Sequence, residues 1–163
     1  MLAALASHRT LQLYHQTANP ALYLLHCLAA TIVALILSLT IGFIAGSEPD
    51  NDMADSAPLA SMLPWPAAAF VWTLVDLAVC KWAALHPVAS IVMGTFNVLG
   101  YLVLGALGVA LFSWDNIAWI PGAWQLLAAV PYAVYLYIGV RAFRAGKKAA
   151  KSEPLVGVLD NSV

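Results

Sequence analysis

The chain has 163 residues, of which 63% are hydrophobic and 9% are charged, whereas a typical soluble domain carries about 25% charged residues. So few charged side chains cannot cover a water-facing surface, and the mean hydropathy of +0.84 agrees, which excludes a soluble globular domain. The net charge of -1 hides an asymmetry, because six of the eight acidic residues precede Asn116 whereas five of the seven basic residues lie within 141–151.

Four apolar stretches follow one another along the chain, at 21–46, 63–85, 88–112 and 119–140. Each is long enough as an α-helix to cross a hydrocarbon core of roughly 30 Å. The first stretch begins after Asn19-Pro20, a pair typical of a turn and a helix start. His86-Pro87 forces a tight reversal between the second and third stretches, because the residue before a proline avoids the α region. The sequence therefore predicts an all-α fold, an integral membrane four-helix bundle over 21–140.

Polar segments flank and separate the predicted helices. Residues 1–20 precede the first helix, and residues 47–62 form an acidic loop with two prolines, whose polar backbone needs water. A short connection over 113–118 leads into the fourth helix. Residues 141–163 form a tail that is basic at first and is expected to be disordered at its end.

The basic residues set the expected orientation. With four spans both termini lie on one side, and Arg9, Lys81 and the basic residues of the tail all fall on that side, seven against none. Lys and Arg near short loops are retained on the cytoplasmic face. We therefore expect both termini in the cytoplasm and the protein in the plasma membrane or an endomembrane.

Asp76 is the most costly residue inside the predicted spans, because an ionisable group in hydrocarbon needs a partner or a function. It lies about 12 Å from the inner end of the second helix, and Lys81 points to a different face of that helix. Counting from the turn at His86-Pro87 places Asn97 at a similar depth, which predicts a hydrogen bond between Asp76 and Asn97. A contact that joins two helices is the favoured interpretation, and a proton or cation site is the alternative.

His26 and Lys81 lie near the cytoplasmic ends of their helices. The stem of Lys81 is long enough to lift the ammonium group to the lipid headgroups. His26 is a candidate haem or metal ligand, but axial ligation by two histidines needs a second one at matching depth. Cys27 and Cys80 show no zinc spacing and are typical of buried apolar residues. We expect no cofactor and no metal.

Small residues and the basic tail indicate how the protein works. The glycines expected to allow close helix packing are Gly42, Gly46, Gly100, Gly105 and Gly108. The cations that follow the fourth span are Arg141, Arg144, Lys147, Lys148 and Lys151. These charges either attract anionic lipid of the inner leaflet or serve topology alone. No catalytic motif is present, which makes an enzyme less expected than a non-enzymatic protein.

The overall pattern resembles that of a known family. Four spans, a short acidic first outer loop, the inner turn in LAVCKWAALHPVASIV and the tail RAFRAGKKAAK are similar to the small MARVEL-type tetraspan proteins, especially the compact fungal ones. The resemblance is one of topology over about residues 10–150 and includes no signature motif. It implies a role in membrane organisation, at lipid-rich subdomains or in vesicle traffic, without enzymatic activity. Asp76 and Lys81 correspond to no motif of that family.

We therefore expect a non-enzymatic membrane organiser or scaffold that acts through helix packing and lipid contact. The alternative is a small transporter, or an accessory subunit of a membrane complex, that uses Asp76. Expected partners are membrane lipids, above all anionic lipid of the inner leaflet, and further copies of the chain or another membrane protein, but not nucleic acid. Asp76→Asn distinguishes the two functions. An asparagine side chain can still form a hydrogen bond to another helix, but it cannot take up and release a proton.

Overall fold

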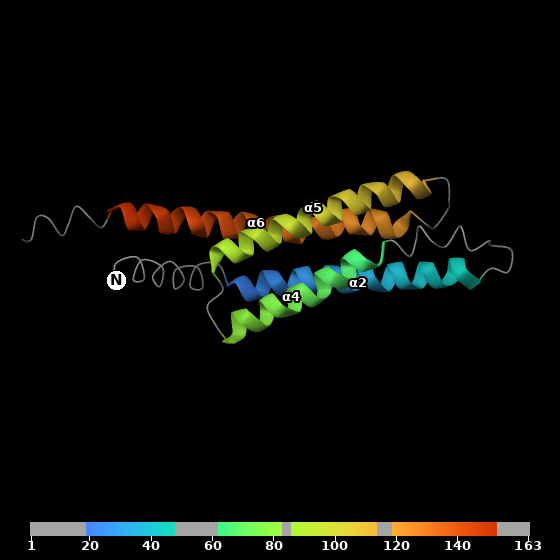
Figure 1. Ribbon diagram of the computed structural model, residues 1–163, viewed down its shortest axis with the longest axis horizontal. Helices are drawn as coiled ribbons and strands as arrows, with labels where there is room; N and C mark the ends of the chain where they lie inside the picture. Colours follow the sequence, from blue (N-terminus) through green and yellow to red (C-terminus); the bar gives the residue numbers. More distant parts are fainter. Residues whose placement is uncertain (1–18, 48–61, 83–85, 114–118, 153–163) are drawn as a thin grey trace, which may run out of the picture.

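The structure, a computed structural model, describes residues 19–47, 62–82, 86–113 and 119–152. These residues form four α-helices, α2 (Pro20–Ser47), α4 (Pro64–Trp82), α5 (Pro87–Phe112) and α6 (Ile120–Ser152). The prediction of an all-α chain with four helices is confirmed. Figure 1 shows that the helices run alternately in opposite directions. The start of α2, the end of α4 and the start of α5 lie at one end of the bundle, and α6 continues beyond that end.

Three of the four helices have the length and composition of membrane spans, namely α2, α5 and the part of α6 up to Lys148. The remaining helix, α4, has 19 residues, and its length of about 28 Å is close to the hydrocarbon thickness of roughly 30 Å. Two prolines in its first turn, Asp76 and Lys81 lower its apolar character. Helix α4 is therefore not among the described helices that have both the length and the composition of a membrane span.

One predicted boundary differs from the observed one. The described part of α4 extends to Trp82, and residues 83–85 of the second predicted span lie outside the described residues. The fourth span was expected to end at 140, but α6 continues to Ser152 and takes in the whole basic segment. Alanine, lysine and arginine are strong helix formers, and no proline lies between Val140 and Pro154. The end of the apolar stretch is thus not the end of the helix.

Asn19 and His86, the residues before Pro20 and Pro87, start helices α2 and α5 as the sequence predicts. Asn19 has φ 35°, in the left-handed region that asparagine tolerates better than most residues, and its carbonyl accepts a hydrogen bond from the backbone N–H of Leu22 at 3.0 Å. His86 is the N-cap of α5 with extended φ and ψ of -73° and 132°. Its Nδ1 accepts a hydrogen bond from the backbone N–H of Val88 at 3.2 Å. Both helix starts are therefore fixed locally.

The buried residues of each helix follow a repeat of three and four. In α2 these are Leu24, Cys27, Thr31, Ala34, Ser38 and Ile41. This average spacing of 3.5 is typical of antiparallel helices packed side by side. The buried polar residues lie on these seams and are Thr31, Ser38, Thr73, Asp76, Ser90, Asn97 and Gln125. Large apolar side chains such as Ile36, Phe43 and Leu99 are exposed instead, an arrangement that suits a hydrocarbon solvent.

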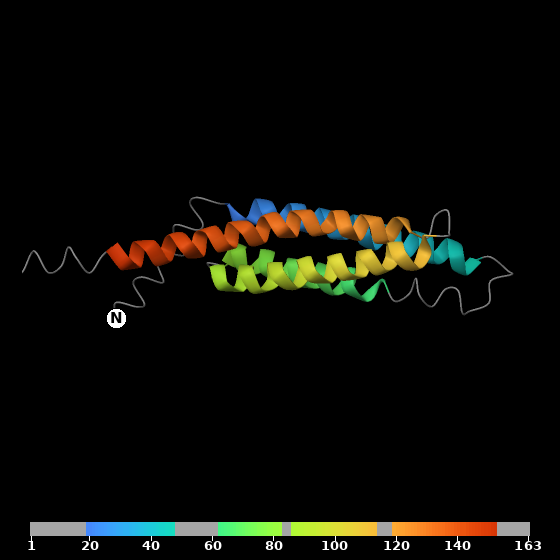
Figure 2. The ribbon, with the colours of Figure 1, turned by 90° about the horizontal axis from the view of Figure 1, so that it is seen from above.

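The four helices do not pack equally. Helix α5 packs closely along α6, and α2 packs against both α4 and α6, while α4 and α5 meet over a short stretch (Figures 1 and 2). Gly122 brings α6 against the α5 backbone, since a Cβ there would lie 2.7 Å from the nitrogen of Val109. Pro131 lies inside α6, and the helix continues through it. The bundle thus has a tight α5–α6 side and a looser α4–α5 side.

Candidate functional site

Four hydroxyl groups, one from each helix, meet inside the bundle. This hydroxyl cluster consists of Thr31 on α2, Thr73 on α4, Tyr101 on α5 and Tyr132 on α6, and all four side chains are buried. The hydroxyl of Tyr132 lies 2.8 Å from Thr31 Oγ1 and 2.6 Å from Thr73 Oγ1. Tyr101 donates to Thr31 Oγ1 at 3.1 Å. The cluster therefore connects all four helices through side-chain hydrogen bonds.

The hydroxyl cluster has fewer hydroxyl hydrogens than short oxygen–oxygen contacts. Each threonine also reaches a carbonyl of its own helix, Thr31 that of Cys27 at 2.9 Å and Thr73 that of Ala69 at 2.7 Å. Four hydroxyl groups supply four hydrogens, whereas the cluster contains five short oxygen–oxygen contacts. At any moment one of the five contacts therefore has no hydrogen in it. While both threonines donate to their backbone carbonyls, the Tyr132 hydroxyl can donate to only one of the two threonines.

The rings of the cluster are packed as well as hydrogen-bonded. The rings of Tyr101 and Tyr132 are stacked, with centroids 5.4 Å apart and planes at 27°. Leu24, Cys27 and Ala69 belong to the same buried group of side chains. None of the four cluster residues was among the candidates named from the sequence. The signal that could have identified them is the spacing of threonine and tyrosine on the buried repeat, because a polar side chain on such a seam needs a partner on another helix.

Asp76 lies one helical turn from the cluster. Its side chain is 8% exposed, and it faces the interior shared by α2, α4 and α6, where its carboxyl is close enough to Cys27, Cys80 and Tyr132 to act on them electrostatically. Along the helix axis Asp76 lies about 9 Å from Trp82, the last described residue of α4. No hydrogen bond or ion pair joins it to any residue that the structure describes.

The predicted hydrogen bond between Asp76 and Asn97 is not formed. The Nδ2 group of Asn97 donates to the carbonyl of Met93 on its own helix at 3.0 Å. Asn97 faces the part of α4 around Ala69, and Asp76 lies about two turns further along α4. Counting residues from the turn gave the wrong level, because the two helices cross at an angle (Figure 2).

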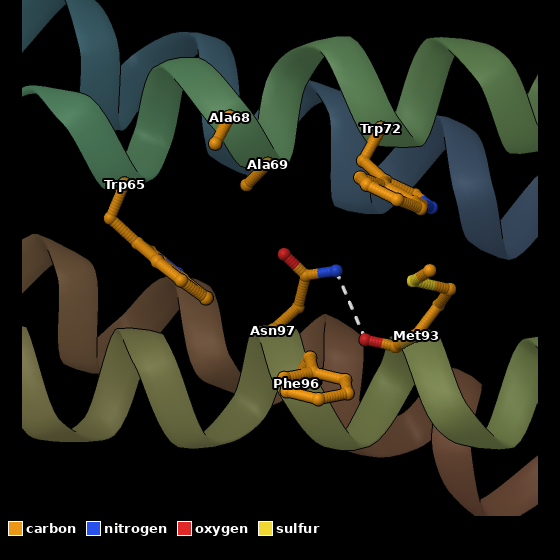
Figure 3. Close-up of a pocket in the computed structure, with 7 residues that line it drawn as sticks. All are labelled: Trp65, Ala68, Ala69, Trp72, Met93, Phe96 and Asn97. Carbon is orange, nitrogen blue, oxygen red and sulfur yellow. Dashed lines mark hydrogen bonds between the residues drawn. The ribbon is translucent and has the colours of Figure 1, made fainter.

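An apolar cleft separates α4 from α5 (Figure 3). Its volume is about 320 Å³, and it is lined by Trp65, Ala68, Ala69, Trp72, Met93, Phe96 and Asn97. We call it the α4–α5 cleft. Figure 3 shows the Trp65 ring closing one end and the side-chain oxygen of Asn97 turned toward α4. Among the described residues that line it, Asn97 is the single one with an amide side chain.

Trp65 closes the cleft because Gly100 leaves room for its ring. A Cβ on Gly100 would lie 1.9 Å from a carbon of the Trp65 indole, a distance that no packing tolerates. The buried Nε1 of Trp65 has no hydrogen-bond partner among the described residues, and neither has Ser38 Oγ or Gln125 Oε1. The close approach of α4 and α5 is thus confined to this end.

A second hollow runs along the C-terminal part of α6. It has a volume of about 650 Å³, and its lining in the described part of the chain is Ala133, Leu136, Tyr137, Val140, Arg141, Arg144, Ala145 and Lys148. We call it the α6 groove. Its lining changes along the helix from apolar to cationic. Lys147 is not among the lining residues, and its Nζ lies 5.0 Å from the centre of the Phe143 ring.

The remaining candidates lie apart from the cluster and both hollows. His26 and Lys81 are exposed, and Nδ1 of His26 lies 2.8 Å from the carbonyl oxygen of Leu22. Among the glycines, Gly105 and Gly108 lie against Gly122, whereas Gly42 has nothing within 4 Å of its Cβ position. The surroundings of Gly46 and Lys151 fall outside the described side chains. Within the described residues, no three His, Cys, Asp or Glu side chains are grouped around a point.

Comparison of the chain with protein-family models, with curated proteins and with solved structures finds no match.

Proposed function

We propose that the protein is an integral membrane organiser with four spans and both termini in the cytoplasm, and that it gathers anionic lipid around the inner end of α6. The α6 groove carries this proposal. Val140 and the residues before it supply an apolar wall about as deep as the upper part of an acyl chain, and Arg141, Arg144 and Lys148 follow on the same side of the helix. A phospholipid has the same sequence of apolar chain and anionic headgroup.

The distribution of side chains supports a membrane location for all four helices. The seams hold the polar residues, and exposed apolar side chains occur on every helix, for example Ile36, Val75, Leu99 and Val134. The described basic residues lie at the end of the bundle where α4 ends and α6 extends (Figure 1), which suits a cytoplasmic side. A role at lipid-rich subdomains, as the MARVEL-type resemblance implies, agrees with this proposal.

The test measures lipid preference with the full chain in nanodiscs that contain phosphatidylcholine and phosphatidylserine. Arg141→Gln/Arg144→Gln removes two cations from the α6 groove, and each attracts anionic lipid by about 1 kcal/mol at the surface. With allowance for screening by salt, we expect the enrichment of phosphatidylserine around the protein, measured by native mass spectrometry, to fall about tenfold at low salt and less at high salt.

Lys147→Gln is the matched control. It removes a neighbouring cation of the same helix that lies over Phe143 and does not line the groove. It should therefore change the enrichment of phosphatidylserine by less than Arg141→Gln alone or Arg144→Gln alone. Equal effects of these three single substitutions would mean that net charge alone attracts the lipid. An unchanged enrichment in the double variant would show that these cations serve topology only and would refute the proposal.

A further inference from the structure

We propose that the α4–α5 cleft binds an uncharged, ring-containing molecule that dissolves in the bilayer and carries a hydroxyl group, and that this hydroxyl donates a hydrogen bond to Asn97. The inference is independent of the lipid proposal, because the residues that line the cleft belong to α4 and α5 and none of them to α6.

The walls of the cleft suit a flat ring. Trp65 and Trp72 of α4 and Met93 and Phe96 of α5 line it, and Figure 3 shows the Trp72 ring opposite the Met93 side chain. Aromatic rings attract one another in stacked or edge-to-face contacts, and a thioether sulfur packs favourably against an aromatic ring. A volume of about 320 Å³ lies within the range of small-molecule pockets, roughly 300 to 1,000 Å³. The cleft therefore has room for a small molecule with fused rings.

The cleft opens sideways and not toward either end of the bundle. Trp72 is 48% exposed and Phe96 61%, and Ala68 in the wall of α4 is exposed as well. In the membrane location proposed above, these exposed side chains face the hydrocarbon of the bilayer. A ligand of the cleft therefore enters from the lipid and has to be soluble there.

Asn97 presents an unpartnered hydrogen-bond acceptor to the cleft. Its side chain is 7% exposed, and its Nδ2 group already donates to the carbonyl of Met93 at 3.0 Å. No described residue donates a hydrogen bond to its Oδ1 atom, and Figure 3 shows this oxygen turned toward α4, between Trp65 and Trp72. A buried amide oxygen needs a donor. Because Oδ1 only accepts, the ligand has to supply the hydrogen, and a hydroxyl is the smallest uncharged group that does so.

The charge and the depth of the site narrow the class of ligand further. No charged residue is among the described residues that line the cleft, so an ion would have no partner there. Asn97 is the eleventh of the 26 residues of α5, about 15 Å from the start of the helix and near the middle of a hydrocarbon core. A phospholipid reaches this depth only with its acyl chains, which have no hydrogen to donate. An aromatic alcohol takes a single hydroxyl to that depth, at a far lower cost than an ion.

The experiment compares β-naphthol with its methyl ether, which has the same fused rings but no hydrogen to donate. Binding to the full chain in nanodiscs of phosphatidylcholine alone is measured by equilibrium dialysis at neutral pH, where β-naphthol is uncharged, and partition into empty nanodiscs is subtracted. We expect saturable binding of β-naphthol at a single site. The dissociation constant of the ether should be about fivefold higher, which is the effect of one hydrogen bond. Phosphatidylcholine carries no net charge, so the α6 groove does not enter the result.

Three variants test where the two ligands bind. Asn97→Leu keeps a similar side-chain volume and removes the acceptor, so it should bind β-naphthol and the ether with equal affinity. Ala68→Leu fills the cleft from an exposed position and should abolish saturable binding of both ligands. Ala106→Leu makes the same change at an exposed position of α5 that does not line the cleft, and it should bind both ligands as the wild type does.

Several results would overturn the proposal. Equal affinity of the wild type for both ligands, or a preference for β-naphthol that persists in Asn97→Leu, would show that Asn97 accepts no hydrogen bond from the ligand. Binding that does not saturate is the result expected if an acyl chain fills the cleft, and unchanged binding in Ala68→Leu would place the ligand elsewhere. If Asn97→Leu does not fold, the comparison of the two ligands in the wild type and that of Ala68→Leu with Ala106→Leu still decide.

Discussion

Tyr132→Phe tests whether the hydroxyl cluster holds the bundle together. The substitution keeps the ring and its stacking on Tyr101 and removes one oxygen, which makes contacts of 2.8 and 2.6 Å with Thr31 and Thr73. Both threonines keep their backbone carbonyl partners, Cys27 and Ala69. No buried donor is therefore left unpaired, and the cost of a stranded polar group does not arise.

The expected magnitude follows from the number of hydrogen bonds lost. Hydrogen bonds between membrane helices contribute about 0.6 kcal/mol on average, and four hydrogens serve the five contacts of the cluster. Tyr132→Phe removes one hydrogen and therefore one hydrogen bond, so we expect a loss of about 0.6 kcal/mol in the free energy of unfolding. Tyr101→Phe also removes one hydrogen, the one that it donates to Thr31, and should cost a similar amount.

The assay is reversible unfolding of the purified chain in mixed micelles with increasing denaturing detergent, followed by circular dichroism. A double-mutant cycle of Tyr132→Phe and Thr73→Val isolates the energy of that pair. Tyr132→Leu provides the upper limit, because it also removes ring packing and should cost about 3 kcal/mol or more. If Tyr132→Phe leaves stability unchanged, or if it costs as much as Tyr132→Leu, the reasoning about the cluster is wrong.

Two more predictions concern packing and topology. Gly122→Ala should destabilise the bundle by at least about 2 kcal/mol in the same assay, because its Cβ would lie 2.7 Å from the Val109 nitrogen and 2.8 Å from the Gly108 carbonyl carbon. Gly42→Ala, whose Cβ would have nothing within 4 Å, is its control, and a similar loss in both would refute close α5–α6 packing. In a variant whose native cysteines are replaced by alanine, a cysteine at Asp52 should react with an impermeant reagent in intact cells, whereas one at Arg144 should react only after lysis. The opposite pattern would invert the topology.

The helices were predictable because each depends on a local pattern. A continuous apolar stretch long enough to span a bilayer, bounded by Asn19-Pro20 or His86-Pro87, is visible in the sequence alone. The end of α6 was placed twelve residues too early, at 140 instead of 152. The end of the apolar stretch marks where a helix leaves the hydrocarbon, and it places no limit on the helix itself.

The contacts between helices were not predictable in the same way. The hydroxyl cluster joins residues 59 to 101 positions apart in Tyr132–Thr73 and Tyr132–Thr31, and their meeting depends on the relative height and crossing of four helices. Asp76 and Asn97 were paired by counting from a turn, which assumes two parallel helices that begin at one level. The crossing of α4 and α5 breaks that assumption (Figure 2). Side-chain chemistry identified which residues need partners, but not which partners they find.

The position of Pro131 has a mechanical consequence. A proline has no N–H to donate, so the carbonyl of Leu127 loses its usual partner within α6, and a helix bends most easily where such a bond is missing. Pro131 directly precedes Tyr132, whose hydroxyl holds α2 and α4. The part of α6 before this point is clamped to α5 through Gly122, and the part after it carries the cations. A sideways force on the C-terminal end of α6 should therefore bend the helix next to Tyr132, the residue that connects the helices, and strain the bundle first at its centre.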